Sequence, residues 1–378
     1  MHTTEKRRRG SPKRSAAVAL AAIVLAAGVA AFAGTGTASA DNPKGKNDHV
    51  SISMELVLTG VQFAQDATLG MKTAAADVGN TSITVTGPPS INPVLAQQHV
   101  TNAVSQSPDG IGIDPFTPDL WGRTLKTVSG QIKNILLMND KPVISPSQLG
   151  SAAVKTYVGI SDANYARALA TATIKGGHLS PSTTGDVLVG QCVPGSTGVL
   201  AERNTAFLQV IHKMLPKTKV IQFNSQVVPA KNTAAWTSEL TAHPNAVLAL
   251  GGCDQDGTSL YLVKKKLGLK VVAGGIDLTP EAIRGVADGT LVATLVDDYF
   301  VQGYVAATLL INAARGKPLP VGWVDTGYTL VTKANVASIK AAASSDKAAI
   351  AYWTPKAKAI LKDLKAKPLK AAWGGLTN

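Results

Sequence analysis

Aspartates that directly follow short apolar runs are the residues of this sequence best suited to chemistry. They are Asp114, Asp254, Asp277 and Asp297, the last followed by Asp298. A carboxylate there could accept hydrogen bonds from hydroxyl groups, or exchange a proton as a general acid or base. The alternative is that each aspartate only caps the following helix. The sequence has no P-loop, GxSxG, HExxH or zinc motif and its six histidines have no ligand spacing, so no metal or cofactor is expected.

Ten short apolar runs are predicted to be strands, and stretches typical of helices separate most of them. The strands are predicted at residues 51–58, 82–86, 110–113, 142–144, 154–158, 186–189, 219–223, 246–250, 271–273 and 291–295. The helices are predicted at residues 63–78, 94–106, 119–138, 164–175, 199–215, 233–242, 257–267 and 301–314. This alternation indicates parallel sheets covered on both faces. Ten strands are too many for one compact Rossmann unit, so we predict an α/β fold with two doubly wound, Rossmann-like lobes.

The stretch AGGIDLTPEA at residues 273–282 shows how such a fold would place an aspartate. An apolar run ends in two glycines, Asp277 follows, and Thr279, Pro280 and Glu281 are residue types that begin helices. In doubly wound sheets, ligands bind beyond the carboxyl ends of the strands. We therefore expect Asp277 and the other aspartates that follow strands on the binding face.

The first 40 residues are predicted to be a secretory signal. A basic head at residues 6–14 precedes an apolar run at residues 16–33 and the small-residue site ASA. We expect export and cleavage after Ala40, with a membrane anchor as the alternative. No cysteine stands near this site, so no lipid anchor is expected there. Two adjacent arginines in the head leave the choice between Sec and twin-arginine export open.

The sequence is basic, which raises the question of an acidic partner. It has 378 residues, is 45% hydrophobic and carries a formal net charge of +13. The predicted signal holds six basic residues and one acid, so the mature chain keeps a net charge of +8. Its lysines cluster at residues 264–270 and 355–370. Export and the lack of a binding motif argue against nucleic acid, so we predict a solvated basic surface.

Several stretches resemble one known family in their order and spacing. The resemblance is carried by SPDGIGIDPFTPD, KPVIS, YVGISDANYARALA, GSTGVLAERNTAFLQVI, TAHPNAVLALGGCDQDG and GGIDLTPEAIRGVADGTLVATLVDD, and it covers residues 50–335. The sequence resembles the type I periplasmic binding proteins, and among them the ribose- and sugar-binding proteins of ABC importers. The last stretch is the most specific, because there the family has an aspartate after a strand, a helix, DG, another strand and a polar hinge residue.

The resemblance implies two lobes joined by three hinge segments, with the ligand between them. The hinge crossings would lie near residues 159–162, 297–298 and 324–326, and the last strand near residues 327–332. The implied parts are a signal peptide 1–40, a linker 41–49, an N-terminal lobe 50–161 plus 298–324, a C-terminal lobe 162–297 plus 325–345, and a C-terminal helix or tail 346–378. The protein would be a monomeric binding protein without enzymatic activity, with an ABC permease as its partner.

The resemblance also implies roles for individual residues. Arg203 matches the arginine near a helix start that binds sugar hydroxyls, and Asp277 matches the ligand-binding aspartate. Phe63 matches an aromatic residue that packs on the ring face of the ligand. Cys253 stands where an asparagine is usual, and Asp254 matches the aspartate beside it.

Departures from the family pattern argue against ribose itself. Asp297 replaces a glutamine at the second crossing, and Ser147 and Gln148 replace the Asp-Arg pair that the ribose branch has after its fourth strand. Asp114 joins the predicted ligand set because it follows the third strand. Further candidate walls of the site are Phe116, Trp236 and Tyr299. For the tryptophan, ordinary core packing is the alternative.

A sugar or polyol fits this set of residues best. Carboxylates accept hydrogen bonds from hydroxyls and a guanidinium donates in a fixed fork, and each such charged hydrogen bond contributes about 1.5–3 kcal/mol. Asp254, Asp277 and Asp297 set three acids against Arg203, so an amine-bearing or cationic ligand is the alternative.

Three other functions fit part of the sequence. Paired carboxylates could hydrolyse glycosides, but no nucleophile–base set accompanies them. A sugar-responsive repressor shares the fold, but the predicted signal occupies the place of its helix-turn-helix. The sequence does not separate transport from a secreted module that presents its ligand to a membrane sensor.

Cys192 and Cys253 are predicted to form a disulfide, because an even cysteine count in an exported chain favours one. Cys192 ends the first strand of the second lobe and Cys253 follows the third. These strands are neighbours in a doubly wound sheet, about 4.8 Å apart, and a disulfide requires Cα atoms roughly 4.4–6.8 Å apart. The alternative is two buried free thiols.

Overall fold

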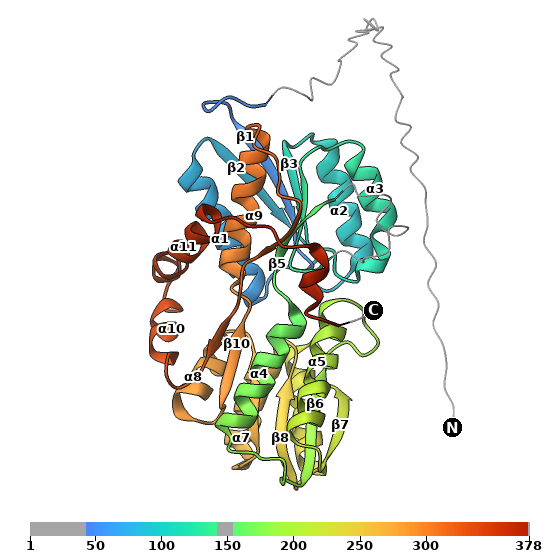
Figure 1. Cartoon of the computed structure of the whole chain (residues 1–378), viewed down its shortest axis with the longest axis vertical. Helices are drawn as coiled ribbons and strands as arrows, with labels where there is room; N and C mark the ends of the chain where they lie inside the picture. Colours follow the sequence, from blue (N-terminus) through green and yellow to red (C-terminus); the bar gives the residue numbers. More distant parts are fainter. Residues whose placement is uncertain (1–42, 142–153, 377–378) are drawn as a thin grey trace, which may run out of the picture. The chain divides into compact units, whose positions relative to one another are not determined.

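A computed structural model describes residues 43–141 and 154–376 of the chain (Figure 1). The predicted signal peptide, the strand predicted at residues 142–144, and Ser147 and Gln148 lie outside these residues. From Pro43 onward the chain forms one compact unit. As predicted, it is built from two α/β lobes, each around a six-stranded sheet.

The first sheet consists of parallel strands in the order β11-β5-β4-β3-β1-β2. The strands are β1 (Val50–Glu55), β2 (Thr81–Thr86), β3 (Gly110–Ile113), β4 (Ile135–Met138), β5 (Thr156–Gly159) and β11 (Gly322–Asp325). The helices are α1 (Gln62–Val78), α2 (Pro93–Ser105), η1 (Pro118–Leu120), α3 (Gly122–Ser129) and α9 (Tyr299–Ala314). One core lies between the sheet and α1 with α9, and another between the sheet and α2 with α3. The central strands are therefore buried on both faces.

The second sheet has the order β12-β10-β9-β8-β6-β7, in which only β12 is antiparallel to its neighbour. The strands are β6 (Gly185–Gln191), β7 (Thr218–Asn224), β8 (Ala246–Gly251), β9 (Val272–Ile276), β10 (Ala293–Val296) and β12 (Thr329–Val331). The helices are α4 (Asp162–Gly176), α5 (Val199–Met214), α6 (Pro229–Ala242), α7 (Asp256–Leu267) and α8 (Pro280–Asp288). As expected for α8, the Thr279 side chain caps it by accepting from the backbone N–H of Ala282.

The helix predicted at residues 119–138 is wrong over its second half. Helix α3 ends at Ser129, and Ile135–Met138 forms the strand β4 between β3 and β5. Side chains of this run alternate between the two cores. A continuous apolar run of this length has no periodicity that separates a buried strand from a helix. The residues directly after β4 are therefore Asn139, Asp140 and Lys141, whereas Ser147 and Gln148 lie outside the described residues.

The chain passes between the two sheets three times, namely between β5 and β6, between β10 and β11, and between β11 and β12. Periodicity alone missed the last two strands, although the resemblance placed one near β12. In the described ranges, no helix has the length and hydropathy needed to cross a membrane.

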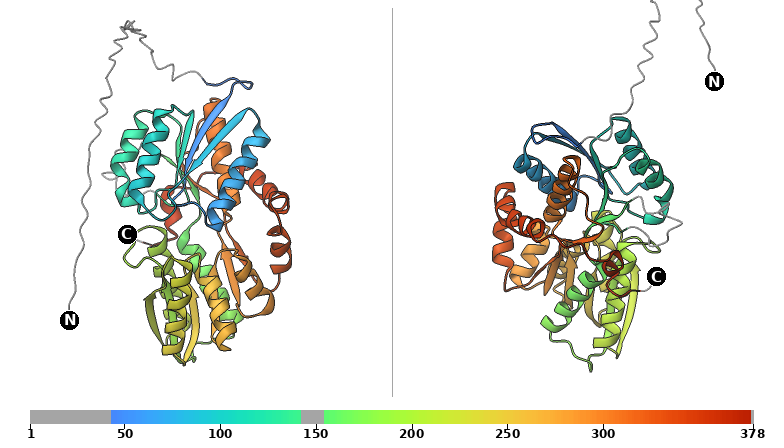
Figure 2. Two further views of the ribbon diagram at one scale, coloured as in Figure 1. Left: turned by 180° about the vertical axis from the view of Figure 1, so that it is seen from behind. Right: turned by 45° about the horizontal axis from the view of Figure 1, so that its top comes forward.

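The C-terminal segment after β12 forms α10 (Val336–Ala342), α11 (Asp346–Lys362) and η2 (Leu369–Trp373). Helix α11 packs against α9 and α1, as both views of Figure 2 show. Lys356 of α11 forms an ion pair with the buried Asp298, which follows β10.

The same segment also contacts the chain near the other two passages. Lys367 forms a β-bridge with Trp323 of β11, and its Nζ lies 2.6 Å from Asp325 Oδ2. The carbonyl of Gly374 accepts a hydrogen bond of 2.7 Å from Arg167 of α4. The C-terminal segment thus contacts the chain beside all three passages between the sheets.

Candidate ligand-binding site

A cavity of about 260 Å³ is lined by residues that follow strands of both sheets. The first lobe contributes Val57, Leu58, Val61, Phe63, Pro89, Ser90, Ile91, Phe116, Asn139, Asp140 and Tyr299. The second lobe contributes Cys192, Val199, Leu200, Arg203, Gln226, Val227, Val228, Pro229, Cys253, Asp254 and Gln255. The cavity therefore lies at the carboxyl ends of the strands, where doubly wound sheets bind ligands.

Aromatic side chains form part of the cavity wall. The rings of Phe63 on α1 and Tyr299 on α9 lie 5.1 Å apart, and Phe116 follows β3. The sequence prediction thus placed three aromatic residues that do line the cavity. Trp236 lies instead in the core of the second lobe, where its Nε1 donates to Asp256 Oδ1 at 2.7 Å.

Arg203 enters the cavity from the first turns of α5, with its guanidinium held by neighbouring groups. Its Nε donates to Asp162 Oδ1 at 2.9 Å, and its Nη2 lies 3.5 Å from Asp297 Oδ2. The guanidinium carbon also lies 4.9 Å from the centre of the Tyr165 ring. With 4% exposure, the side chain is fixed in position before a ligand arrives.

Asp162, the first residue of α4, links the two buried cations at the site. Its second oxygen lies 2.8 Å from Nζ of Lys141, which also lies 3.0 Å from Glu202 of α5. Sequence reasoning missed Asp162, Lys141 and Glu202. The only signal was an acid, Asp162, at a helix start within the otherwise apolar stretch YVGISDANYA.

Three predicted acids follow β8, β9 and β10 and lie at different depths. Asp254 lines the cavity, whereas Asp277 and Asp297 lie behind it, 2% and 0% exposed. Burial raises the pKa of Asp277 well above its usual range, and the charges of Asp254 and Asp297 raise it further. Burial also raises the pKa of Asp254 and of Asp297, although the charge of Arg203 lowers both. A raised pKa lowers the free-energy cost of protonating a carboxyl, and a protonated carboxyl can donate as well as accept hydrogen bonds.

Asp277 has an unusual backbone conformation. Its φ of 69° is in the left-handed region, which aspartate tolerates better than most residues. Within the described residues its carboxyl interacts with that of Asp254, and no other group hydrogen-bonds to its two oxygens. A Cβ on Gly275, two residues earlier, would lie 2.5 Å from Gly257 Cα, so glycine allows α7 to approach the end of β9. The aspartate between β9 and α8 is thus a buried acid that does not itself line the cavity.

The first lobe contributes two more acids. Asp114 is buried, accepts from Asn139 Nδ2 at 3.2 Å, and has a pKa raised by burial to about 7. Asp140 lines the cavity, and its Oδ1 accepts from the backbone N–H of Val199 at 3.4 Å. Burial and the nearby carboxylates raise the pKa of Asp140. Asp140 and the cation of Lys141 thus directly follow β4, whereas Ser147 and Gln148, which the sequence prediction assigned to this position, lie outside the described residues.

The two cysteines of the sequence are joined by a disulfide at the cavity wall. Cys192 follows β6 and Cys253 follows β8, and these strands are paired in the sheet. Their Cα atoms are 6.0 Å apart. The backbone N–H of Cys253 donates to Asp256 Oδ2 at 3.0 Å. The turn that carries Asp254 is thus fixed on both sides.

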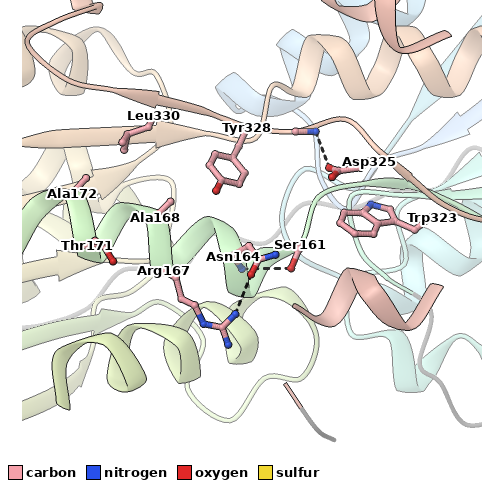
Figure 3. Close-up of a pocket in the computed structure, with 11 residues that line it drawn as sticks. Ser161, Asn164, Arg167, Ala168, Thr171, Ala172, Trp323, Asp325, Tyr328 and Leu330 are labelled. Atoms are coloured by element: carbon pink, nitrogen blue, oxygen red, sulfur yellow. Dashed lines mark hydrogen bonds between the residues drawn. The ribbon is translucent and has the colours of Figure 1, made fainter. Parts of the chain in front are cut away.

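A separate groove of about 630 Å³ lies between α4 and the segment from β11 to β12. Figure 3 shows Tyr328 pointing from this segment toward α4, which carries Asn164 and Arg167. The groove shares no residue with the cavity described above. Among the described residues, no group of three or more His, Cys, Asp or Glu side chains is arranged to hold a metal ion.

Several solved structures share this fold. The glucose-galactose binding protein GanP from Geobacillus stearothermophilus has a TM-score of 0.65 at 18% identity, over 76% of this chain and 98% of that chain. An ABC transporter solute binding protein from Burkholderia graminis C4D1M, in complex with D-arabinose, has a TM-score of 0.65 at 22% identity, over 76% and 96%. One from Agrobacterium vitis with bound D-fucose has a TM-score of 0.68 at 22% identity, over 76% and 96%. At these identities the similarity shows the fold.

The family comparison extends over most of both lobes. No curated protein sequence matches the chain significantly. The family described as periplasmic binding protein domain matches residues 56–318, which is more than half of the 378 residues. As the sequence resemblance implied, the chain belongs to the periplasmic binding protein domain family.

Proposed function

We propose that this protein captures a small sugar or polyol between its two lobes and delivers it to an ABC importer. The observation that carries the proposal is that Arg203, Asp140 and Asp254 line one cavity with the aromatic pair Phe63 and Tyr299. Charged groups can exchange hydrogen bonds with hydroxyls, and aromatic rings can cover the apolar face of a sugar.

The sugar class and the importer are supported by what similar proteins bind. The Burkholderia graminis and Agrobacterium vitis proteins are ABC transporter solute binding proteins, with D-arabinose and D-fucose bound. A membrane sensor is the alternative receiver of the ligand. A binding protein without enzymatic activity is in keeping with the family.

We propose that some residues of the site contact the ligand directly and that others lie behind the cavity wall. Arg203 donates to the ligand, and Asp140 and Asp254 exchange hydrogen bonds with it. Asp114, Asp277 and Asp297 lie behind the wall, and we assign them to the charge and proton balance of the site. Phe63 and Tyr299 cover the ring, and Phe116 adds a further wall. Cys192 and Cys253 hold the turn that carries Asp254.

We further propose that the lobes close around the ligand. The N-terminal lobe comprises residues 50–161 plus 298–324, and the C-terminal lobe comprises residues 162–297 plus 325–345. Their connections would act as hinges, the usual location of closure in two-lobed binding proteins. We also propose that the protein is exported and monomeric, with a signal peptide cleaved after Ala40. Intact mass of the secreted protein would test the cleavage site.

An amine-bearing ligand is the second candidate, and the charge balance favours it. The two buried cations near the cavity, Arg203 and Lys141, already contact Asp162. Asp140 Oδ2 has no hydrogen-bond partner within the described residues. An ammonium group could pair with Asp140 and Asp254 without competing with a cation of the protein.

A thermal-shift screen of the mature protein against sugars, polyols and small amines separates these candidates. A ligand at a hundred times its Kd stabilises the native state by about 2.7 kcal/mol, so a true ligand raises the Tm measurably. A shift with sugars or polyols supports the proposal, and a shift with amines alone supports the second candidate. No shift with any sugar or polyol would count against the proposal, whereas turnover of a glycoside would indicate an enzyme.

A further inference from the structure

The cavity has an outer part formed by aliphatic side chains, which we call the apolar rim. The apolar rim consists of Leu58, Val61, Ile91, Leu200, Val227 and Val228. Val227 and Val228 are 44% and 49% exposed, whereas Asp140 and Arg203 are 1% and 4% exposed. Exposure thus places Asp140 and Arg203 at depth and the two valines at the outside, with Asp254 and the other four residues of the apolar rim half-buried between them.

Both lobes contribute to the apolar rim. Leu58 and Val61 follow β1, and Ile91 follows β2, whereas Leu200 lies at the start of α5. Val227 and Val228 stand in the turn before α6. A group that extends outward from the depth of the cavity would therefore meet aliphatic side chains on two sides. Adjacent exposed valines at the opening of a cavity are typical of a surface that contacts a ligand or partner.

The apolar rim exceeds what a free sugar requires. A sugar carries hydroxyls around its ring, and a hydroxyl buried against aliphatic groups loses its water without gaining a hydrogen bond. The ring face needs only one or two walls, which Phe63 and Tyr299 supply at depth. An aryl or alkyl group has the opposite preference, because it gains from leaving water beside aliphatic side chains.

We infer that the ligand is amphipathic, with a sugar or polyol head between Arg203, Asp140 and Asp254 and an apolar aryl or alkyl substituent covered by the apolar rim. The chemical class is that of glycosides with an apolar aglycone. The inference rests on the proposed function, because the head is the sugar of that proposal.

Calorimetric titration of the mature protein with matched pairs tests the inference. The pairs are D-galactose with phenyl β-D-galactopyranoside, D-glucose with phenyl β-D-glucopyranoside, and D-fucose with phenyl β-D-fucopyranoside. In at least one pair, the glycoside is expected to bind about tenfold tighter than its free sugar, because the phenyl ring is buried by the apolar rim. Its binding is also expected to show the more negative heat-capacity change.

A double variant, Val227→Ser with Val228→Ser, assigns the preference to the apolar rim. Both positions are well exposed, so the variant is expected to keep the wild-type Tm. It should weaken binding of the phenyl glycoside about fivefold and that of the free sugar less than about twofold. The matched control is Val321→Ser, at a valine that is 71% exposed and does not line the cavity, and it should change neither affinity.

The outcomes separate the inference from the proposed function. Free sugars that bind as tightly as their phenyl glycosides would overturn the inference and leave the proposed function standing. A glycoside preference that survives the double variant would also overturn it, because the apolar rim would not be its source. If no member of any pair binds although a sugar or polyol of the thermal-shift screen does, the inference fails alone, whereas no binding in the pairs and no shift in the screen would overturn the proposed function and the inference with it.

Discussion

Arg203 is prepared for its ligand by residues that do not line the cavity. Asp162 accepts from its Nε, the carbonyl of Gly252 accepts from its Nη1 at 3.4 Å, and the guanidinium carbon lies over the Tyr165 ring. A guanidinium held in this way loses little conformational freedom when a ligand binds, so more of the hydrogen-bond energy appears as affinity. Because of these contacts, we expect Arg203 to contribute more to stability than the less buried Asp254 does.

Asp254→Ala and Arg203→Ala are expected to differ in their effect on the free energy of unfolding. Both should weaken ligand binding by about 2 kcal/mol, or about thirtyfold, because each removes a charged hydrogen bond. Only Arg203→Ala should also lower the free energy of unfolding, by about 3–5 kcal/mol, because it leaves the buried Asp162 without one of its partners. Calorimetry and urea unfolding measure the two effects, with the exposed Asp363→Ala as control. Unchanged affinity in both variants would remove these residues from the site.

Buried carboxyls should make the ligand-free protein more stable at mildly acidic pH. Burial raises the pKa of Glu55 and of Asp114 to about 7, against partial lowering by hydrogen bonds from Thr86 and Asn139. The folded protein thus binds these protons more tightly than the unfolded chain. Their stabilising contribution is complete below about pH 4 and is lost as the pH rises to about 7.

Urea unfolding at about pH 5.5 and about pH 8 checks this sign. The free energy of unfolding should be larger at the lower pH, and Glu55→Gln with Asp114→Asn should flatten the difference. A wild-type protein that is more stable at the higher pH would contradict the assignment of raised pKa values to these two groups.

At the scale of elements, the sequence predicted a helix or strand boundary correctly where residues within one turn mark it. The start of α8 followed from a cap, a proline and an acid, because these act within one turn. The boundary between α3 and β4 could not be predicted from the sequence. Four adjacent apolar residues are compatible with a helix or a strand until the neighbouring strands are known. The pairing of β4 with β3 and β5 decided it.

The site was predictable to a similar extent. Phe63, Arg203 and Asp254 line the cavity, and they were found because they match a family pattern at strand ends and helix starts. The sequence did not reveal Asp162, Lys141 and Glu202. Their contacts join residues 21 to 61 positions apart, and only the packing of α4, α5 and the end of β4 brings these residues together. The burial of Asp277 and Asp297 behind the wall also depends on packing.

Removal of the disulfide between the ends of β6 and β8 should affect both stability and the binding site. Cys192→Ala with Cys253→Ala frees the ends of β6 and β8, which the bond joins across a sequence separation of 61. The free energy of unfolding should fall by about 2–4 kcal/mol, and ligand binding should weaken because the turn carrying Asp254 gains freedom. Urea unfolding and calorimetry measure both. Two alkylated cysteines in unreduced, denatured wild-type protein would contradict the bond itself.

At the scale of the whole molecule, the C-terminal segment couples the lobes through the passages between the sheets. Lys356 of α11 pairs with Asp298, whose carboxylate is buried and whose pKa burial raises to about 6. Lys367 pairs with Asp325 at the end of β11. We expect a segment that contacts each passage to restrain the relative movement of the lobes.

Lys356→Met should therefore reduce stability, with Lys362→Met as the matched control at an exposed position of the same helix. The first change leaves the buried Asp298 with Thr329, 3.2 Å away, as its remaining side-chain partner and should lower the free energy of unfolding by about 1–2 kcal/mol. The control should lower it by less than about 0.5 kcal/mol. Equal effects of both changes in urea unfolding would show that the ion pair has no special role.

We expect the two lobes to close around the ligand. Acids from both lobes, Asp140 and Asp254, line the same cavity, so a ligand that hydrogen-bonds to both would favour the closed arrangement. Contacts that cross between the proposed lobes, such as Lys141 with Glu202 at 3.0 Å, would also stabilise this arrangement. Small-angle X-ray scattering should therefore give a smaller radius of gyration with the sugar that causes the largest thermal shift than without it. A sugar that causes no thermal shift, at the same concentration, is the control and should leave the radius unchanged. An equal radius at saturation with the true ligand would mean that the lobes do not move as proposed and that binding occurs in a cavity already closed.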